Sequence, residues 1–282
     1  MVQAGGRVER RVAERELSPT PLVTSETDGT HRVDRSMVRA VINECLKVGL
    51  LHEDGDFLVV CSPLDQLVQN HLSMQSVLPR VITDLVMIPE GDSGDLATAV
   101  AWYLGQDALS PPGTWKEFGS ALQQQGASEL LRFNDNTFQM FEYWARYLGF
   151  AIRLAVPSAP TDPYRLAPDP TEALRRVLEG ILGQGHEYHR LGPCMQRVGD
   201  ACPVLEGGRI RKEVDRFSSK REPRALSSAT SHALLRLADE GVLSLQTRSD
   251  ADALILVDGD KTIPVSAIAW KGHSAERNDQ AH

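Results

Sequence analysis

The sequence predicts a mainly α-helical protein with small β-hairpins, and two observations lead to this fold class. The first is a helical stripe of apolar residues that ends at a glycine and precedes two short apolar runs, within residues 226–259. The second is the recurrence of this pattern at residues 33–62 and, with a slightly different phase, at 134–158. A helix that ends in glycine and leads into a two-stranded wing is typical of a winged helix-turn-helix. We therefore expect tandem winged helix-turn-helix modules.

The helical stripe is clearest in the first copy. Val38, Ile42 and Cys45 stand 11, 7 and 4 residues before Gly49. Spacings of three and four mark the face of a helix that packs on a core, and glycine supplies the left-handed residue that ends it. The "DG" of the following segment indicates a tight hairpin turn, whereas the middle copy shows no second wing strand. The corresponding residues are Thr230, Leu234, Leu237 and Gly241 in the C-terminal copy, and Phe138, Phe141, Ala145, Leu148 and Gly149 in the middle copy.

Proline content and polar stretches indicate the domain boundaries. Five prolines between residues 157 and 170 are typical of a stiff linker, and "MIPEGDSGD" at 87–95 is a second, softer boundary. Few apolar positions precede the first copy, so a further helix is missing there and that module is incomplete or completed by a partner. The expected segments are a poorly ordered arm (1–30), winged-helix module 1 (31–75), a helical or winged-helix-like module 2 (76–156), the Pro-rich linker (157–170), winged-helix module 3 with preceding helices (171–271) and a disordered tail (272–282).

Composition indicates a globular protein of the cytoplasm. The 282 residues are 41% hydrophobic and 24% charged, without an apolar run long enough for a membrane helix. The polar N-terminus has no signal-peptide core, and four cysteines are too few for a disulfide scaffold. A net charge of −8 argues against general nucleic-acid binding. However, residues 207–224 hold seven Lys or Arg against three Asp or Glu, a local charge of +4.

That basic segment lies just before the C-terminal helix and makes the helix a candidate reader of double-stranded DNA. With Ser227 or Ser228 as its cap, the helix would turn Ser228, Ser231 and His232 outwards near its start. Against this, helix capping alone accounts for the serines, and winged helices also dock proteins. The first copy has an acidic wing tip, and the aromatic middle copy is more typical of core or interface. The candidate DNA-binding residues are Arg209, Arg211, Lys212, Lys220, Arg221, Arg224, Ser228, Ser231, His232 and Arg248, with Arg35, Ser36 and Arg39 in the first copy.

Signatures of catalysis are weak. The sequence lacks a phosphate-binding loop, a zinc-protease motif and a nucleophile elbow. An acidic segment could imitate the metal-binding hairpin of a nuclease, but Asp and Gly are also the ordinary residues of a turn. A group of His and Cys residues could bind zinc, but their spacing does not match a site built from Cys-x-x-Cys pairs. We therefore expect no enzyme, cofactor or metal. The residues concerned are Asp252, Asp258, Asp260 and Lys261 for the nuclease alternative, and His186, His189, Cys194 and Cys202 for the metal.

Three strings carry a resemblance: "VRAVINECLKVGLL", "FEYWARYLGFA" and "LSSATSHALLRLADEGVLSLQTRSDADALIL". They resemble the DpdG family, encoded in bacterial Dpd gene clusters that place deazaguanine bases in DNA and restrict DNA lacking them. The resemblance covers most of residues 33–270 and implies a role in anti-phage defence, but it carries over no active site.

Two hypotheses follow from the residues and the resemblance together. The first is a non-enzymatic DNA-binding component of a defence or modification and restriction system. The second is an adaptor that docks a helicase or nuclease through its winged helices, with little DNA contact. Convergence of the basic residues on one face with Ser231 would favour the first. Paired modules also suit a homodimer.

Overall fold

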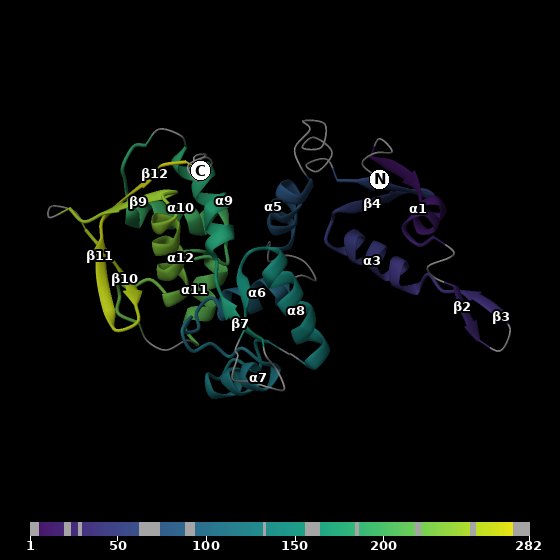
Figure 1. The fold of residues 1–282 in the computed structure, drawn as a ribbon, viewed down its shortest axis with the longest axis horizontal. Coiled ribbons are helices and arrows are strands. Elements are labelled where there is room, and N and C mark those ends of the chain that lie inside the picture. The colour runs from purple at the N-terminus through teal and green to yellow at the C-terminus, as the bar shows by residue number, and fades with distance from the viewer. Residues whose placement is uncertain are drawn as a thin grey trace, which may run out of the picture. The chain divides into compact units, whose positions relative to one another are not determined.

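The structure is a computed structural model, and it divides into two compact units (Figure 1). Unit 1 comprises residues 1–86 and 90–93, and unit 2 comprises 87–89 and 94–282. The division falls within the soft boundary predicted at 87–95. Both units combine helices with small antiparallel sheets, as predicted. The described residues are 6–19, 24–27, 30–61, 74–87, 94–131, 134–155, 164–183, 186–217, 221–248 and 252–272.

Unit 1 is built around two helices, Arg10–Leu17 and Ser36–Lys47, and a three-stranded sheet of order β1-β5-β4. Its core joins Ala13, Ile42 and Leu58. The prediction of a poorly ordered arm at residues 1–30 is wrong for residues 7–17, because these form a strand and a helix that pack on this core. The chain thus supplies the helix that module 1 seemed to lack. The elements are β1 (Arg7–Glu9), α1 (Arg10–Leu17), β2 (Thr24–Thr27), β3 (Thr30–Val33), α3 (Ser36–Lys47), β4 (Leu51–Asp54), β5 (Phe57–Val60) and α5 (Met74–Val86).

Unit 2 begins with three helices and a hairpin. The ring of Phe118 lies 4.8 Å from that of Trp102 and 5.3 Å from that of Phe138, both edge-on, so these aromatics form core. Residues 164–168 form a strand, so the linker prediction for 157–170 is wrong there. This strand pairs with residues 151–155, a pairing that the sequence pattern of the middle copy did not show. The elements are α6 (Gly94–Tyr103), α7 (Trp115–Gln124), α8 (Asp135–Tyr147), β6 (Ala151–Ala155) and β7 (Tyr164–Pro168).

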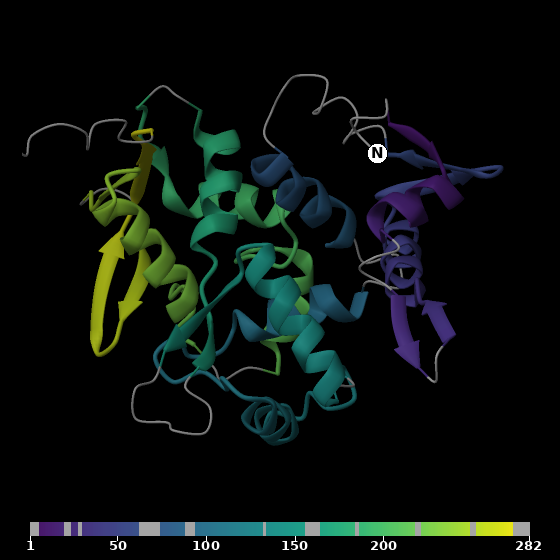
Figure 2. The ribbon, with the colours of Figure 1, turned by 45° about the vertical axis from the view of Figure 1, so that its right-hand side comes forward.

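The rest of unit 2 contains the C-terminal copy. The sequence predicts that its two apolar runs pair with each other, but they do not. Instead β9 pairs with β12, and β10 pairs with β11. Helix α12 contacts α9, β9 and β10, and Figure 2 shows it beside the β10–β11 hairpin. The elements are α9 (Thr171–Leu182), β8 (His189–Arg190), α10 (Leu191–Ala201), α11 (Arg209–Asp215), α12 (Ser228–Asp239), β9 (Leu243–Gln246), β10 (Leu254–Asp258), β11 (Lys261–Val265) and β12 (Ala267–Trp270).

The predicted repeat is present as a shared topology. In unit 1, β1 and α1 precede α3, which is followed by β4 and β5. In unit 2, β8 and α10 precede α12, which is followed by β9 and β12 of one sheet, with the β10–β11 hairpin between them. The strand orders β1-β5-β4 and β8-β12-β9 correspond, with the last strand in the middle. The glycines that end α3 and α12 have φ angles of +75° and +76°, in the left-handed region. Within the described ranges, no helix is long and apolar enough to cross a membrane.

Candidate functional site at the start of helix α12

Helix α12 is covered on more than one face. The side chain of Ser227 caps it by accepting from the Thr230 N–H at 3.3 Å, and Thr230, Leu234 and Leu237 are buried as predicted. Ser231, however, has no exposed surface and accepts a hydrogen bond from the Val257 N–H at 3.0 Å. The prediction that Ser231 faces outwards is therefore wrong, because β10 packs against this side of the helix.

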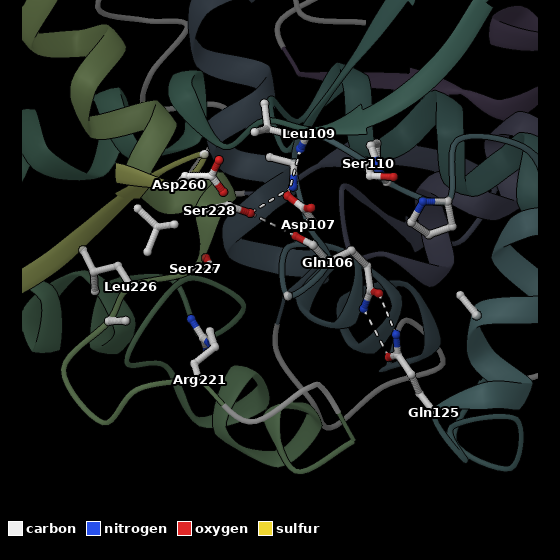
Figure 3. A pocket seen from close by; sticks show the side chains of 18 of the residues that line it. Gln106, Asp107, Leu109, Ser110, Gln125, Arg221, Leu226, Ser227, Ser228 and Asp260 are labelled. Atoms are coloured by element: carbon white, nitrogen blue, oxygen red, sulfur yellow. Dashed lines mark hydrogen bonds between the residues drawn. The ribbon is translucent and has the colours of Figure 1, made fainter. Parts of the chain in front are cut away.

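A loop of the same unit occupies the first turn of α12. The hydroxyl of Ser228 accepts a hydrogen bond from the Ala108 N–H at 2.9 Å and donates its own O–H to the Gln106 carbonyl at 3.5 Å (Figure 3). One turn later, Nε2 of His232 lies 3.6 Å from a carboxylate oxygen of Asp258. Ser228 and His232 are thus only partly accessible, and both already face groups of the protein itself.

Two of the predicted basic residues belong to an internal ion cluster. Arg211 has no exposed side-chain surface; its Nε donates to Asp215 at 2.7 Å, and its Nη2 lies 3.8 Å from Glu206. Arg221 donates to Glu206 at 3.0 Å and to Asp215 at 2.9 Å. Two guanidinium groups therefore face two carboxylates. The prediction of Arg211 as a surface residue is wrong, and the charge of Arg221 is compensated.

Glu206 connects this cluster to the start of α12. It accepts hydrogen bonds from the N–H and hydroxyl of Ser227 at 3.2 and 2.9 Å and from the Thr230 hydroxyl at 3.2 Å. Burial alone would raise the pKa of Glu206, but Arg211, Arg221 and the Ser227 hydrogen bonds outweigh it and hold the pKa below its ordinary value. Glu206 is not among the residues predicted from sequence. Its signal there is a single acidic residue in the otherwise uncharged run "CPVLEGG".

The remaining predicted residues of the C-terminal copy have different surroundings, and Ser231 is itself buried. Arg209 is exposed, and Lys212 donates to Gln196 at 3.3 Å. Arg224 lies 3.6 Å from Asp252 with both side chains exposed, and the Arg248 guanidinium lies 5.4 Å above the Tyr188 ring. Lys220 lies outside the described residues.

In unit 1, the corresponding helix α3 is more open. Arg39 donates to Glu14 at 3.0 Å, and the exposed Ser36 donates its backbone N–H to Asp34 at 2.8 Å. Arg35 is partly buried. The same helix leaves Met37 and Val41 80% and 56% exposed. Exposed apolar side chains therefore lie on the same helix as the polar residues predicted to contact DNA, but on a different face of it.

A groove of about 1240 Å³ opens beside the start of α12. The loop 105–112, helix α7, the two hairpins of unit 2 and residues 221–228 line it. At one side Gln125 donates to the Gln106 side-chain oxygen at 2.8 Å and accepts from the Trp102 indole N–H at 2.9 Å. Figure 3 shows this amide pair opposite Asp260. The groove lies next to the predicted recognition helix, and the side chains of Gln106 and Gln125 on one side of it are hydrogen-bonded to each other.

Within the described residues, those considered for zinc binding and for nuclease activity do not form a metal site. In the described parts of the chain, no three His, Cys, Asp or Glu side chains are placed to hold a metal ion. His186 contacts the Trp270 carbonyl at 3.2 Å, and Cys202 is buried after α10. Burial raises the pKa of Cys194 to about 11, only partly offset by Arg197, so its thiol is protonated at neutral pH.

The fold and the site describe a mainly α-helical protein in which a three-stranded sheet of unit 2 has the same strand order as the sheet of unit 1. A model of the DpdG-like family matches residues 1–251, and the chain belongs to this family. The match confirms the resemblance seen in the sequence and gives the chain the context of Dpd modification and defence systems. No curated protein and no solved structure matches the chain.

Proposed function

We propose that this chain is a non-enzymatic adaptor of a Dpd-associated system, which docks a helicase or nuclease partner through winged-helix modules and contacts DNA little. The coverage of α12 carries the proposal. A recognition helix presents its first turns to base edges in the major groove. In α12, Ser231 is buried under β10, and Ser228 is hydrogen-bonded to the loop that crosses the helix start. Insertion into a groove would require the protein to give up these contacts.

The charge distribution also supports the adaptor role. Phosphate binding releases counterions only where cations are free to replace them. Arg211 and Arg221 are compensated by Glu206 and Asp215, and the whole chain carries a net charge of −8. Two of the six described cations of the basic segment therefore face carboxylates of the protein itself and are not available to phosphates.

The repeated topology supports the winged-helix assignment, and α3 supports docking. The three-stranded sheets of the two units share one strand order, and in each a helix ending in glycine precedes the last two strands of that sheet, which fits a helix followed by a two-stranded wing. Exposed Met37 and Val41 on α3 are suited to burial against a protein. Direct DNA contact by Arg35, Ser36 and Arg39 is the second candidate, since α3 keeps an accessible face.

The DNA arm of the test is fluorescence anisotropy of a labelled duplex of about 30 base pairs at several salt concentrations. The test variant reverses three exposed arginines of the C-terminal copy, Arg209, Arg224 and Arg248, to Glu; Arg221 is avoided because its loss would unsettle the ion cluster. A control reverses Arg15, Arg190 and Arg216, which are also exposed. We expect weak binding that both variants reduce equally, because only overall charge matters.

Tight binding with a steep salt dependence, lost in the test variant alone, would overturn the proposal. Loss confined to Arg35→Glu/Arg39→Glu would instead establish α3 as the DNA-binding helix. The protein arm mixes the full chain with the purified helicase and nuclease components of its system and measures mass by light scattering after gel filtration. A complex that forms without DNA is expected, and the absence of any complex would refute the adaptor role.

A further inference from the structure

The groove beside α12 has exposed apolar walls contributed by separate elements. Leu109 comes from the loop after α6, Leu154 from β6, and Ile255 and Val257 from β10. Leu109 is 65% exposed and Leu154 is 44% exposed. The Cδ1 atom of Leu109 lies 3.8 Å from where a Cβ on Gly259 would stand, so this side chain reaches the tip of the β10–β11 hairpin. Apolar surface held in a concave site favours burial against a ligand.

The cations that line the groove are already paired. Arg165 forms an ion pair with Glu117, which lines the groove beside it. Arg221 points its guanidinium at Glu206 and Asp215. Positive charge at the groove is therefore compensated within the protein.

Three further carboxylates line the groove and are exposed: Asp107, Glu222 and Asp260. In the portion of the chain that the structure describes, none of them is ion-paired with Lys or Arg. Asp107 accepts only the Leu109 backbone N–H, at 3.0 Å. The groove thus combines apolar walls with about three uncompensated negative charges, which would repel a nucleic-acid backbone.

We infer that this groove binds a short segment of a partner protein in which Lys or Arg flanks apolar side chains. The apolar side chains would pack on Leu109, Leu154 and Ile255, while the cations meet Asp107, Glu222 and Asp260. The inference rests on the proposed adaptor role and specifies where the partner is held. A volume of about 1240 Å³ is larger than most small-molecule sites and accommodates several side chains of a peptide.

The test selects binders from a phage-displayed library of random peptides of about 12 residues against the full wild-type chain. The enriched peptide is then made with a fluorescent label and titrated by anisotropy. The main variant is Asp107→Lys/Glu222→Lys/Asp260→Lys. The matched control, Glu179→Lys/Glu213→Lys/Asp239→Lys, makes the same charge change at exposed carboxylates of unit 2 outside the groove. Leu109→Asp tests the apolar wall and is at an exposed position, so folding should be retained.

We expect enriched peptides with Lys or Arg beside apolar residues. The main variant and Leu109→Asp should each weaken binding about tenfold, and the control should stay within about twofold of wild type. Peptides without cations, no enrichment, or equal binding by the main variant and the control would overturn the inference. A partner complex that persists in the main variant would do the same while leaving the adaptor role intact. Failure to form any complex refutes the adaptor role independently.

Discussion

Replacing Glu206 by Gln should destabilise unit 2 by about 3 kcal/mol, because the buried ion cluster would lose one of its two carboxylates. The Glu206 side chain accepts four hydrogen bonds, from Ser227 twice, Thr230 and Arg221, and is 12% exposed. Glutamine keeps the shape of the glutamate side chain, but its amide N–H groups would face the groups that donate hydrogen bonds to Glu206. Arg211 and Arg221 would then share Asp215 as their one carboxylate. Breaking a buried pair on one side costs about 3–5 kcal/mol, and the residual exposure of Glu206 indicates the lower end.

A second substitution tests the cause. Adding Arg211→Met to Glu206→Gln removes the buried cation that has lost its partner, at a position without exposed surface. We expect the double variant to regain at least half of the loss, because the cluster is again neutral and Met fills a similar volume. A double variant no more stable than Glu206→Gln would refute the electrostatic explanation and assign the loss to packing.

The assay is urea unfolding followed by tryptophan fluorescence, which reports on unit 2 because all four tryptophans lie there. Glu179→Gln is the control, since Glu179 is an exposed carboxylate of α9, and its effect should stay within about 0.5 kcal/mol. A loss below about 1 kcal/mol for Glu206→Gln, or one equal to the control, would contradict the reasoning. The tryptophans are Trp102, Trp115, Trp144 and Trp270.

Three further predictions concern pH, thiol reactivity and one glycine. The lowered pKa of Glu206 stabilises unit 2 above about pH 4.3, and this contribution is lost as pH falls towards the folded-state pKa. When the pH is lowered from about 6 to about 3, the urea midpoint should therefore fall less in Glu206→Gln than in wild type. An equal fall in both proteins would contradict this. Cys194, buried with its pKa raised to about 11, should resist maleimide at about pH 8 until urea is added, which mass spectrometry of the labelled peptide checks. Gly149→Ala should cost about 2–3 kcal/mol in the urea assay, because a Cβ there meets Glu172 Cβ at 2.8 Å at a φ of +77°. Gly241→Ala, with φ +76° and open space, should cost about 1 kcal/mol; equal losses would refute the steric argument.

The periodic features of the fold could be predicted from sequence because they are local. A stripe at spacings of three and four fixes which side of a helix is buried, and Ile42, Leu234 and Leu237 are buried accordingly. The glycines after α3 and α12 adopt the left-handed conformation that ends a helix. Strand pairing was less predictable, since β9 is joined to β12 across an intervening hairpin that no local pattern reveals.

The misplacement of Ser231 has a physical reason. A single apolar stripe assigns the rest of the helix to solvent, but α12 carries Ala229, Ser231 and Ala233, all buried. Small side chains allow neighbouring elements to approach a helix closely on a second face. This run of small residues in the sequence was the available signal that α12 is packed on more than one side.

The linker prediction failed for a related reason. Prolines suit extended backbone, and that includes sheet edges as well as linkers. Pro168 ends β7 and Pro170 caps α9, and both are buried. Proline count alone therefore cannot distinguish a segment between domains from an edge strand that leads into a helix.

The basic segment shows why summed charge is a poor guide to surface charge. The sum of +4 for residues 207–224 leaves out Glu206, one position before it. The fold brings this carboxylate to both Arg211 and Arg221, so two of the counted cations neutralise internal partners instead of meeting phosphates. The contacts made in the fold, and not the summed charge, determine which cations remain free.

The loop after α6 has two effects at one place in unit 2. By hydrogen-bonding to Ser228 through Gln106 and Ala108, it covers the helix start that a DNA-reading module must expose. The same loop carries Leu109 and Asp107 to the edge of the groove, where one supplies apolar surface and the other negative charge. The features that oppose DNA contact at α12 are therefore the ones that form a surface for a cationic, apolar protein segment. Shortening the loop should accordingly expose Ser228 and remove Leu109 and Asp107 from the groove together, whereas Ser231 would stay covered by β10.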